Sequence, residues 1–188
     1  MNLFIKAKQQ ALDYERKYLA RFPDSYFTPK SIQKLEALND YPDQRTDLRM
    51  VDVAAKAKLL KAQLIDQFPE NSFSVKIERY SGGSSINAYY KGTKIDTQII
   101  KELENTYSDA GKTDIQSDYF DYDNYCSITE DSKQRQERIS KCPKCENCGS
   151  QEDRIAITSD NKIICNWCFN SGKFSSFKKL MHDVEVLA

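Results

Sequence analysis

The sequence predicts an α+β protein with a separate cysteine-rich unit near its C-terminal end. Apolar residues recur at helical spacing as far as residue 68, and between residues 73 and 90 the period changes from 3.6 to 2. Two Cys-x-x-Cys pairs then follow, with sixteen residues between them. We therefore expect a small antiparallel sheet with helices, an N-terminal helical extension, and a C-terminal zinc ribbon followed by a terminal helix.

Three helices are predicted before the sheet. Residues 2–20 place apolar side chains every three or four positions, which is typical of an amphipathic helix. Residues 31–39 form a short second helix, for which Ser31 is the expected N-cap. The most regular apolar stripe covers residues 52–68 and predicts the third helix.

The predicted sheet begins with a hairpin. Apolar and polar residues alternate over 73–77 and again over 86–90, and the Ser-Gly-Gly-Ser sequence at 81–84 supplies the turn. A helix over 96–107 and a third strand within 113–125 complete the pattern. The order helix, strand, strand, helix, strand predicts an α+β domain.

The chain divides into four predicted segments. Residues 1–49 form the N-terminal helical extension and residues 50–128 form the α+β domain. The polar residues 129–141 form a linker, which could be helical. Residues 142–188 hold the zinc ribbon with its C-terminal helix. Within that last segment we expect the helix at 174–187, where apolar residues again have helical spacing.

The four cysteines that we predict as metal ligands are Cys145, Cys148, Cys165 and Cys168. Their spacing lies within the range of four-cysteine zinc sites, in which two tight turns direct four thiolates at one Zn²⁺. No position is left for water, so the predicted site is structural. Gly149 favours Cys148 as the second cysteine of its turn, because the next residue takes a left-handed conformation that glycine adopts freely.

Two alternatives remain open for the cysteines. Cys142 forms a further Cys-x-x-Cys pair with Cys145, so Cys142 could replace Cys145 or Cys148 as a ligand. The cysteines could instead form disulfides, but the sequence shows no secretion signal and is long enough to build a core. We therefore expect a reducing compartment and metal, with Cys126 as an ordinary thiol.

Charge restricts the ways in which the chain could bind nucleic acid. It has 28 basic and 28 acidic residues, so binding would need a local basic patch. The candidates surround the predicted zinc ribbon: Lys141, Lys144, Arg154, Lys162, Trp167, Lys173, Lys178 and Lys179. Trp167 stands between two predicted ligands, where its ring could stack on a base. Alternatively, Trp167 packs against the C-terminal helix and the lysines only increase solubility.

A second candidate surface is acidic and rich in tyrosine. Residues 104–132 hold eight acidic residues and one lysine. Within them, the predicted protein-binding residues are Asp118, Tyr119, Asp121, Tyr122 and Asp123. Such a surface could occupy a basic channel of another protein by imitating phosphates, or it could be a sheet edge with half-buried tyrosines.

The sequence predicts no catalytic residues. Its one histidine, His182, lies on a predicted helix and is interpreted as a surface or packing residue, so Ser–His or Cys–His catalysis is not expected, and a single histidine supplies too few ligands for a zinc hydrolase. No apolar run is long enough to span a membrane. We therefore expect a non-enzymatic protein that binds other macromolecules.

Part of the chain resembles a known domain. The resemblance rests on Phe68-Pro69, the Phe-Ser-Val-Lys-Ile sequence at 73–77, the Tyr-Ser-Gly-Gly-Ser-Ser-Ile sequence at 80–86, and the aspartates and aromatic residues of 117–123. Over residues 50–128 the chain resembles a small domain of the large polyvalent proteins of phages and conjugative elements. No catalytic residue is associated with that domain.

The resemblance implies a mobile-element protein that counters host defence in the cytoplasm of a bacterial cell. It suggests an anti-CRISPR inhibitor, which would bind an RNA-guided nuclease (a Cas effector) or its guide RNA. One alternative is a zinc-ribbon protein that binds nucleic acid or regulates other proteins. Another is an interaction domain detached from a larger polyvalent protein.

Overall fold

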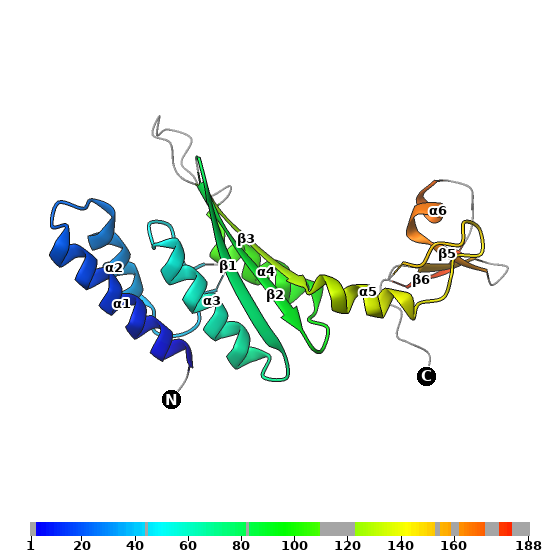
Figure 1. Cartoon of the computed structure of the whole chain (residues 1–188), viewed down its shortest axis with the longest axis horizontal. Helices are drawn as coiled ribbons and strands as arrows, with labels where there is room; N and C mark the ends of the chain where they lie inside the picture. The colour runs from blue at the N-terminus through cyan, green and yellow to red at the C-terminus, as the bar shows by residue number, and fades with distance from the viewer. Residues whose placement is uncertain are drawn as a thin grey trace. The chain divides into compact units, whose positions relative to one another are not determined.

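The computed structural model divides the chain into two compact units, Met1–Glu130 and Asp131–Ala188. The described residues are 3–43, 45–81, 83–109, 123–152, 155–158, 162–171 and 177–181. Within these ranges, no helix combines the length and the apolar character that crossing a bilayer requires. Figure 1 shows the helices and strands of both units.

The first unit begins with three helices, close to the predicted positions. They are α1 (Leu3–Arg21), α2 (Phe27–Ala37) and α3 (Val53–Gln67). Helix α1 packs against both α2 and α3, and the apolar stripes of the three helices meet in one core. The most deeply buried side chains of this helical core are Phe4, Leu35, Leu48, Leu59, Leu60 and Leu64.

The predicted N-cap at Ser31 is wrong. Helix α2 begins at Phe27, because Pro29 fits the first turn of a helix, where its missing N–H is not needed. Ser31 therefore lies inside the helix, and its hydroxyl donates a hydrogen bond of 3.0 Å to the buried carboxyl of Glu15. Burial raises the pKa of Glu15 against the opposing effect of this bond.

The sheet of the first unit has three strands in the order β1 (Ser72–Tyr80), β2 (Gly83–Lys91) and β3 (Asp123–Glu130). Strands β1 and β2 form the predicted antiparallel hairpin. The third strand is predicted within 113–125; β3 overlaps that range only at its start and continues to Glu130, and residues 113–122 lie outside the described residues. Strand β3 pairs with β2 in parallel, so the sheet is mixed and the prediction of an antiparallel sheet is wrong for this pair. Helix α4 (Thr97–Tyr107) causes the difference, because it carries the chain back across the sheet before β3 begins.

Helices cover one face of this sheet. Helix α3 lies along β1 and β2, α4 lies along β3, and the two helices contact each other (Figure 1). Alternate residues of β2, such as Ile86 and Ala88, are fully buried beneath them, whereas Tyr89 on the opposite face is half-buried. The α+β class and the N-terminal helices are thus confirmed.

A network of buried polar side chains joins α3 to the segments on either side of residues 110–122. The fully buried Nζ of Lys56 donates to Oδ2 of Asp109 at 2.6 Å, and Nδ2 of Asn124 donates to the same oxygen at 2.7 Å. The backbone N–H of Asp109 donates to the carbonyl of Asn124 at 2.8 Å, and the Ser84 hydroxyl donates to the Asn124 side chain. These bonds balance the buried lysine charge.

The second unit begins with α5 (Ser132–Ser140), which occupies most of the predicted linker. Asp131 caps this helix by accepting hydrogen bonds from the backbone N–H groups of Lys133 and Gln134. Beyond it, β4 (Ile155–Thr158) and β5 (Ile163–Cys165) form the predicted antiparallel ribbon.

The predicted terminal helix is wrong where the structure describes it. Residues Phe177–Met181 form strand β6, which pairs antiparallel with β4 and completes a sheet in the order β5-β4-β6. A short apolar segment fits a helix and a strand about equally well, and the open edge of β4 decides in favour of the strand. The rest of the predicted helix, 182–187, lies outside the described residues, as do 174–176.

Candidate metal centre

The first pair of predicted ligands lies in a tight turn. The backbone N–H of Gly149 donates to the carbonyl of Cys145 at 2.8 Å, and the N–H of Cys145 donates to the carbonyl of Ser150 at 2.8 Å. Gly149 has a φ of 73°, the left-handed conformation expected just after Cys148. The turn therefore places both thiols on its inner side, in the manner of a zinc knuckle.

The second pair lies where β5 meets the short helix α6 (Asn166–Asn170). Cys165 ends the strand and acts as the N-cap of the helix, since its sulfur accepts a hydrogen bond from the N–H of Cys168 at 3.4 Å. Both cysteines are buried with Ile164 in the small core of this unit. The strand and the helix start thus fix the direction of both sulfurs.

The two turns bring the four predicted ligands together. The sulfur atoms of Cys145, Cys148, Cys165 and Cys168 all lie within 4.8 Å of one another. The Cys148 and Cys165 sulfurs are 3.7 Å apart, close to the edge of about 3.8 Å in a tetrahedron of sulfurs around one metal at about 2.3 Å. The group can therefore hold a metal ion with a closed set of four thiolates.

The other cysteines lie outside this group. Cys142 is buried, and its thiol donates to the carbonyl of Arg138 at 3.5 Å. Cys126 is half-buried in the first unit, where burial, with a smaller effect of the Glu104 carboxylate, raises its pKa to about 12. All six cysteines are free thiols in the structure. The arrangement thus groups Cys145, rather than Cys142, with the other three sulfurs.

Polar side chains support the cluster from outside. The Ser150 hydroxyl lies 3.0 Å from the Cys148 sulfur, and Nδ2 of Asn147 donates to the Cys168 sulfur at 3.1 Å. The hydrogen bonds from the side chain and backbone of Ser150 lower the pKa of Cys148 to about 6. Since metals bind thiolates, these bonds favour the binding form of the one exposed cysteine of the group.

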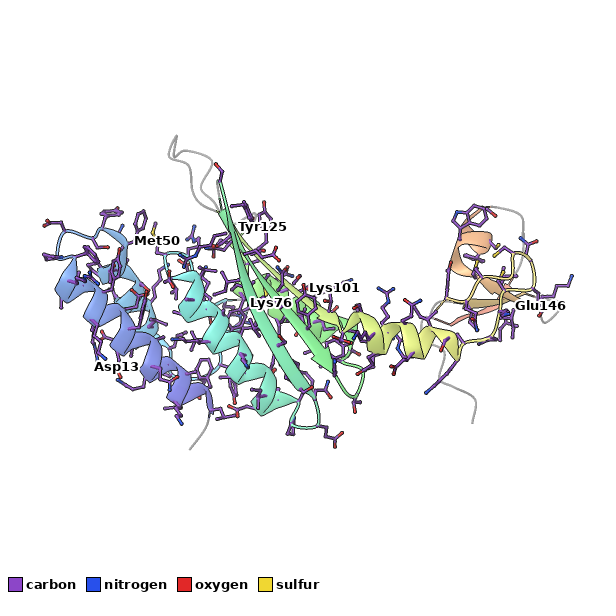
Figure 2. The ribbon with its side chains drawn as sticks, in the orientation of Figure 1. Asp13, Met50, Lys76, Lys101, Tyr125 and Glu146 are labelled. Carbon is purple, nitrogen blue, oxygen red and sulfur yellow. The ribbon has the colours of Figure 1, made fainter. Side chains whose placement is uncertain are left out.

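Glu146 attaches the first turn to the ribbon (Figure 2). Its backbone N–H donates to the carbonyl of Ile163 at 2.9 Å, and the N–H of Ile163 donates to its carboxylate at 2.8 Å. Sequence reasoning missed Glu146, Asn147 and Ser150. Their position inside or just after a Cys-x-x-Cys pair is the signal that could have identified them, because polar turn residues there can bond nearby backbone and sulfur atoms.

The predicted nucleic-acid-binding residues are only partly described. Trp167 is 65% exposed, so its ring is largely open to solvent, and Lys141, Lys144 and Lys162 are also exposed. The backbones of Lys178 and Lys179 lie in β6. Arg154 and Lys173 lie outside the described residues, as do the side chains of Lys178 and Lys179.

Most of the predicted acidic surface also lies outside the described residues. This holds for Asp118, Tyr119, Asp121 and Tyr122, whereas the backbone of Asp123 begins β3. Tyr125, two residues further along the strand, is exposed on the sheet (Figure 2). The predicted protein-binding role of this surface therefore stays a prediction.

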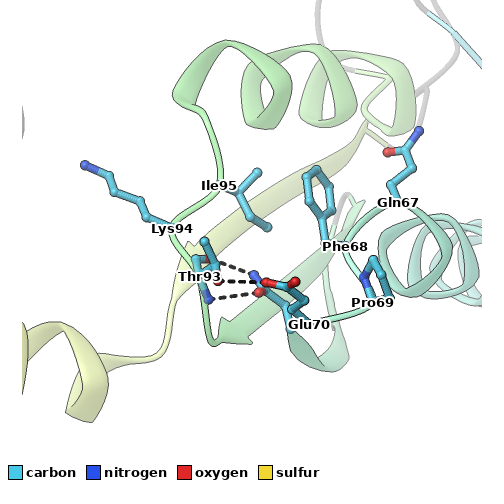
Figure 3. Close-up of a pocket in the computed structure, with 8 residues that line it drawn as sticks. Gln67, Phe68, Pro69, Glu70, Thr93, Lys94 and Ile95 are labelled. Atoms are coloured by element: carbon cyan, nitrogen blue, oxygen red, sulfur yellow. Dashed lines mark hydrogen bonds between the residues drawn. The ribbon is translucent and has the colours of Figure 1, made fainter.

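A pocket of about 270 Å³ lies in the first unit, between the end of α3 and the start of α4. The polar residues that line it are Gln67, Glu70, Asn71, Thr93 and Lys94. Figure 3 shows the pocket. Nδ2 of Asn71 donates to the carbonyl of Thr93 at 2.7 Å, and the N–H of Thr93 donates to Oδ1 of Asn71 at 2.9 Å. These bonds join two loops and occupy both the nitrogen and the oxygen of the Asn71 amide. We therefore interpret the polar groups of the pocket as structural.

The comparisons with known proteins add no family to these observations. No family model matches the chain, and no curated protein or solved structure matches it either.

Proposed function

We propose that this chain is a non-enzymatic nucleic-acid-binding protein whose second unit is a zinc ribbon. The observation that carries the proposal is the exposed ring of Trp167, held between Cys165 and Cys168 on α6. A large aromatic ring that is anchored on both sides but open to solvent is suited to stacking on an unpaired base.

Zinc is the metal that fits the four sulfurs best. Four thiolates form a soft, tetrahedral and closed ligand set, which is typical of structural zinc sites. Helix α6 has only five residues, too few to be stable alone in water. The metal would therefore fix the backbone on both sides of Trp167 and hold its ring ready for a ligand.

Charge supports the same site more weakly. Lys141, Lys144 and Lys162 are exposed in this unit and could contact phosphates. Three such contacts to a single strand would give a slope of about −2 in the logarithm of affinity against the logarithm of salt concentration. A zinc centre with four thiolates has a formal charge of about −2, which offsets part of this attraction. We therefore expect stacking to contribute more than charge.

Tryptophan fluorescence tests the proposal directly. The chain contains one tryptophan, so its emission reports on Trp167 alone. We expect a single-stranded oligonucleotide to quench this emission. Trp167→Ala should weaken binding of a labelled oligonucleotide roughly 5- to 150-fold, the cost of losing about 1–3 kcal/mol from one stacked base.

Two controls separate stacking from other effects. Trp167→Phe keeps a smaller aromatic ring and should retain part of the affinity, and a duplex of the same length should quench less because its bases are already stacked. Unchanged emission with the single strand, together with equal affinity of Trp167→Ala and the original protein, would refute the proposal.

The narrower role as an inhibitor of an RNA-guided nuclease stays a prediction. Support for it comes from the resemblance of residues 50–128, and a zinc ribbon that holds single-stranded RNA would be compatible with guide-RNA binding. Capture of partners from bacterial lysate, with and without ribonuclease, would separate a protein partner from an RNA partner.

A further inference from the structure

A group of exposed aromatic side chains lies on the first two helices of the first unit. We name these residues the aromatic stripe: Tyr14, Tyr18, Phe22, Tyr26 and Phe27, which are 42–65% exposed. The first three follow one another at intervals of four residues along and just beyond α1, so they share one side of the helix, about 6 Å apart along its axis. The buried side of α1 uses other residues, including Phe4, Leu12 and Glu15.

The rings contact one another in two pairs, one at the end of α1 and one at the start of α2. The rings of Tyr18 and Phe22 have centroids 4.8 Å apart, and those of Tyr26 and Phe27 are 5.3 Å apart. Exposed apolar rings in contact with one another are uncommon on a protein surface without a binding role. The stripe therefore marks a surface for a ligand with flat or apolar groups.

Cationic side chains accompany the rings. The Arg21 guanidinium lies 5.5 Å from the centre of the Phe22 ring, Nζ of Lys30 lies 3.9 Å from that of Tyr26, and Nζ of Lys58 lies 5.7 Å from that of Tyr14. These three cations reach the stripe from α1, α2 and α3. A ligand on the rings would thus meet positive charge along the length of the stripe.

The nearby acidic groups do not cancel this charge. Between residues 13 and 30 the acids are Asp13, Glu15 and Asp24, against Arg16, Lys17, Arg21 and Lys30. Glu15 is buried, and burial raises its pKa, so the exposed carboxylates in that stretch are those of Asp13 and Asp24. Arg16 is paired with Glu36 of α2 at 2.7 Å, which leaves the remaining cations to attract an anionic ligand.

We propose that the aromatic stripe binds single-stranded nucleic acid. An apolar peptide would match the rings but not the cations, and an acidic peptide would match the cations but not the exposed rings. A single strand has both stackable bases and phosphates, and proteins that bind it combine aromatic residues with basic ones in this way. This inference concerns the first unit and does not depend on zinc or on Trp167.

The test uses the full chain with Trp167→Ala as the starting protein, so that the zinc ribbon contributes little. Anisotropy of a labelled single-stranded oligonucleotide gives its affinity. We expect the added pair Tyr18→Ala and Phe22→Ala to weaken binding by at least 5-fold, since each lost stacking ring costs roughly 5- to 150-fold. Both side chains are exposed, so an unchanged melting temperature should accompany the loss.

Two matched variants identify the kind of contact. Tyr18→Leu with Phe22→Leu keeps apolar area but removes stacking, and it should lose binding as the alanine pair does. Lys17→Glu with Arg21→Glu leaves all rings in place and should weaken binding and flatten its dependence on salt. Full binding by the leucine pair would instead indicate an apolar partner and would overturn the proposal.

The two proposals fail in different ways. If Trp167→Ala alone abolishes binding, the stripe is not a nucleic-acid site and only the zinc ribbon binds. If Trp167→Ala changes nothing while the stripe variants abolish binding, the stripe stands and the proposed role of Trp167 fails. Oligonucleotide affinity that is equal in all variants overturns both.

Discussion

At the residue scale, the metal centre depends on four sulfurs and a few polar neighbours. Three of the sulfurs are buried, and the fourth, on Cys148, is exposed and bonded to Ser150. The turn around it also needs Gly149, because its φ of 73° is costly for other residues. The site is therefore shielded from solvent at three of its cysteines and exposed to solvent at Cys148.

The four sulfurs should not be replaceable. Purified protein should contain about one zinc per chain, and Cys148→Ser or Cys168→Ser should lower zinc affinity at least 10-fold, because even loss of a supporting partner costs roughly 10- to 100-fold. Cys142→Ser and Cys126→Ser should leave the zinc content unchanged, since neither sulfur belongs to the group. Elemental analysis after dialysis measures the zinc content of each variant. Loss of zinc in Cys142→Ser would show that Cys142 is a ligand.

Gly92, in the turn after β2, should tolerate no side chain. Its φ is 126°, and an added Cβ would lie 2.7 Å from Oδ1 of Asn71 and 3.0 Å from the carbonyl oxygen of Glu70. Gly92→Ala should therefore destabilise the first unit by about 1–3 kcal/mol, measured by thermal unfolding. Gly149→Ala is the comparison: its φ of 73° also strains the backbone of alanine, but an added Cβ would meet no atom within 4 Å, so this variant should destabilise the other unit by less. An equal shift in both variants would contradict this explanation.

At the element scale, the sequence predicts those helices and strands whose apolar residues recur at a regular spacing. The helices α1, α3 and α4 and the β1–β2 hairpin lie within a few residues of their predicted bounds, because each has a regular apolar pattern. The two cysteine turns were also predictable, since ligand spacing and Gly149 specify them locally. Local pattern is sufficient for these elements.

The missed elements depend on contacts that the local pattern does not contain. Alternation in β3 gives no strand direction, which comes from the crossover through α4. Strand β6 exists because β4 offers it an edge. Lys56 is buried inside α3 because of Asp109, which lies 53 residues further along the chain. Such distant partners cannot be read from one segment.

At the scale of the whole molecule, the two units have separate cores. The first is a large apolar core from helices and sheet, and the second is a small cluster of cysteines with Ile164 and Phe169. So small a core gives little stability by itself, and metal binding would supply much of the folding free energy. The two units should therefore respond differently to loss of metal.

A strong chelator should unfold the second unit and leave the first intact. Hydrogen–deuterium exchange should show loss of protection at β4 and β5, while β2, at the centre of the first sheet, keeps its protection. Adding zinc back should restore the slow exchange of the ribbon amides. Retained protection of β5 after complete removal of metal would show that the cluster does not stabilise this unit.

The buried network around Lys56 also determines where the chain can accept new sequence. The backbones of Asp109 and Asn124 are hydrogen-bonded to each other, so the chain positions on either side of residues 110–122 are held close together. Doubling the length of a flexible loop costs only about 0.6 kcal/mol once its ends are fixed. Because the network holds both flanking positions, we expect a peptide tag inserted between them to leave the core of the first unit intact.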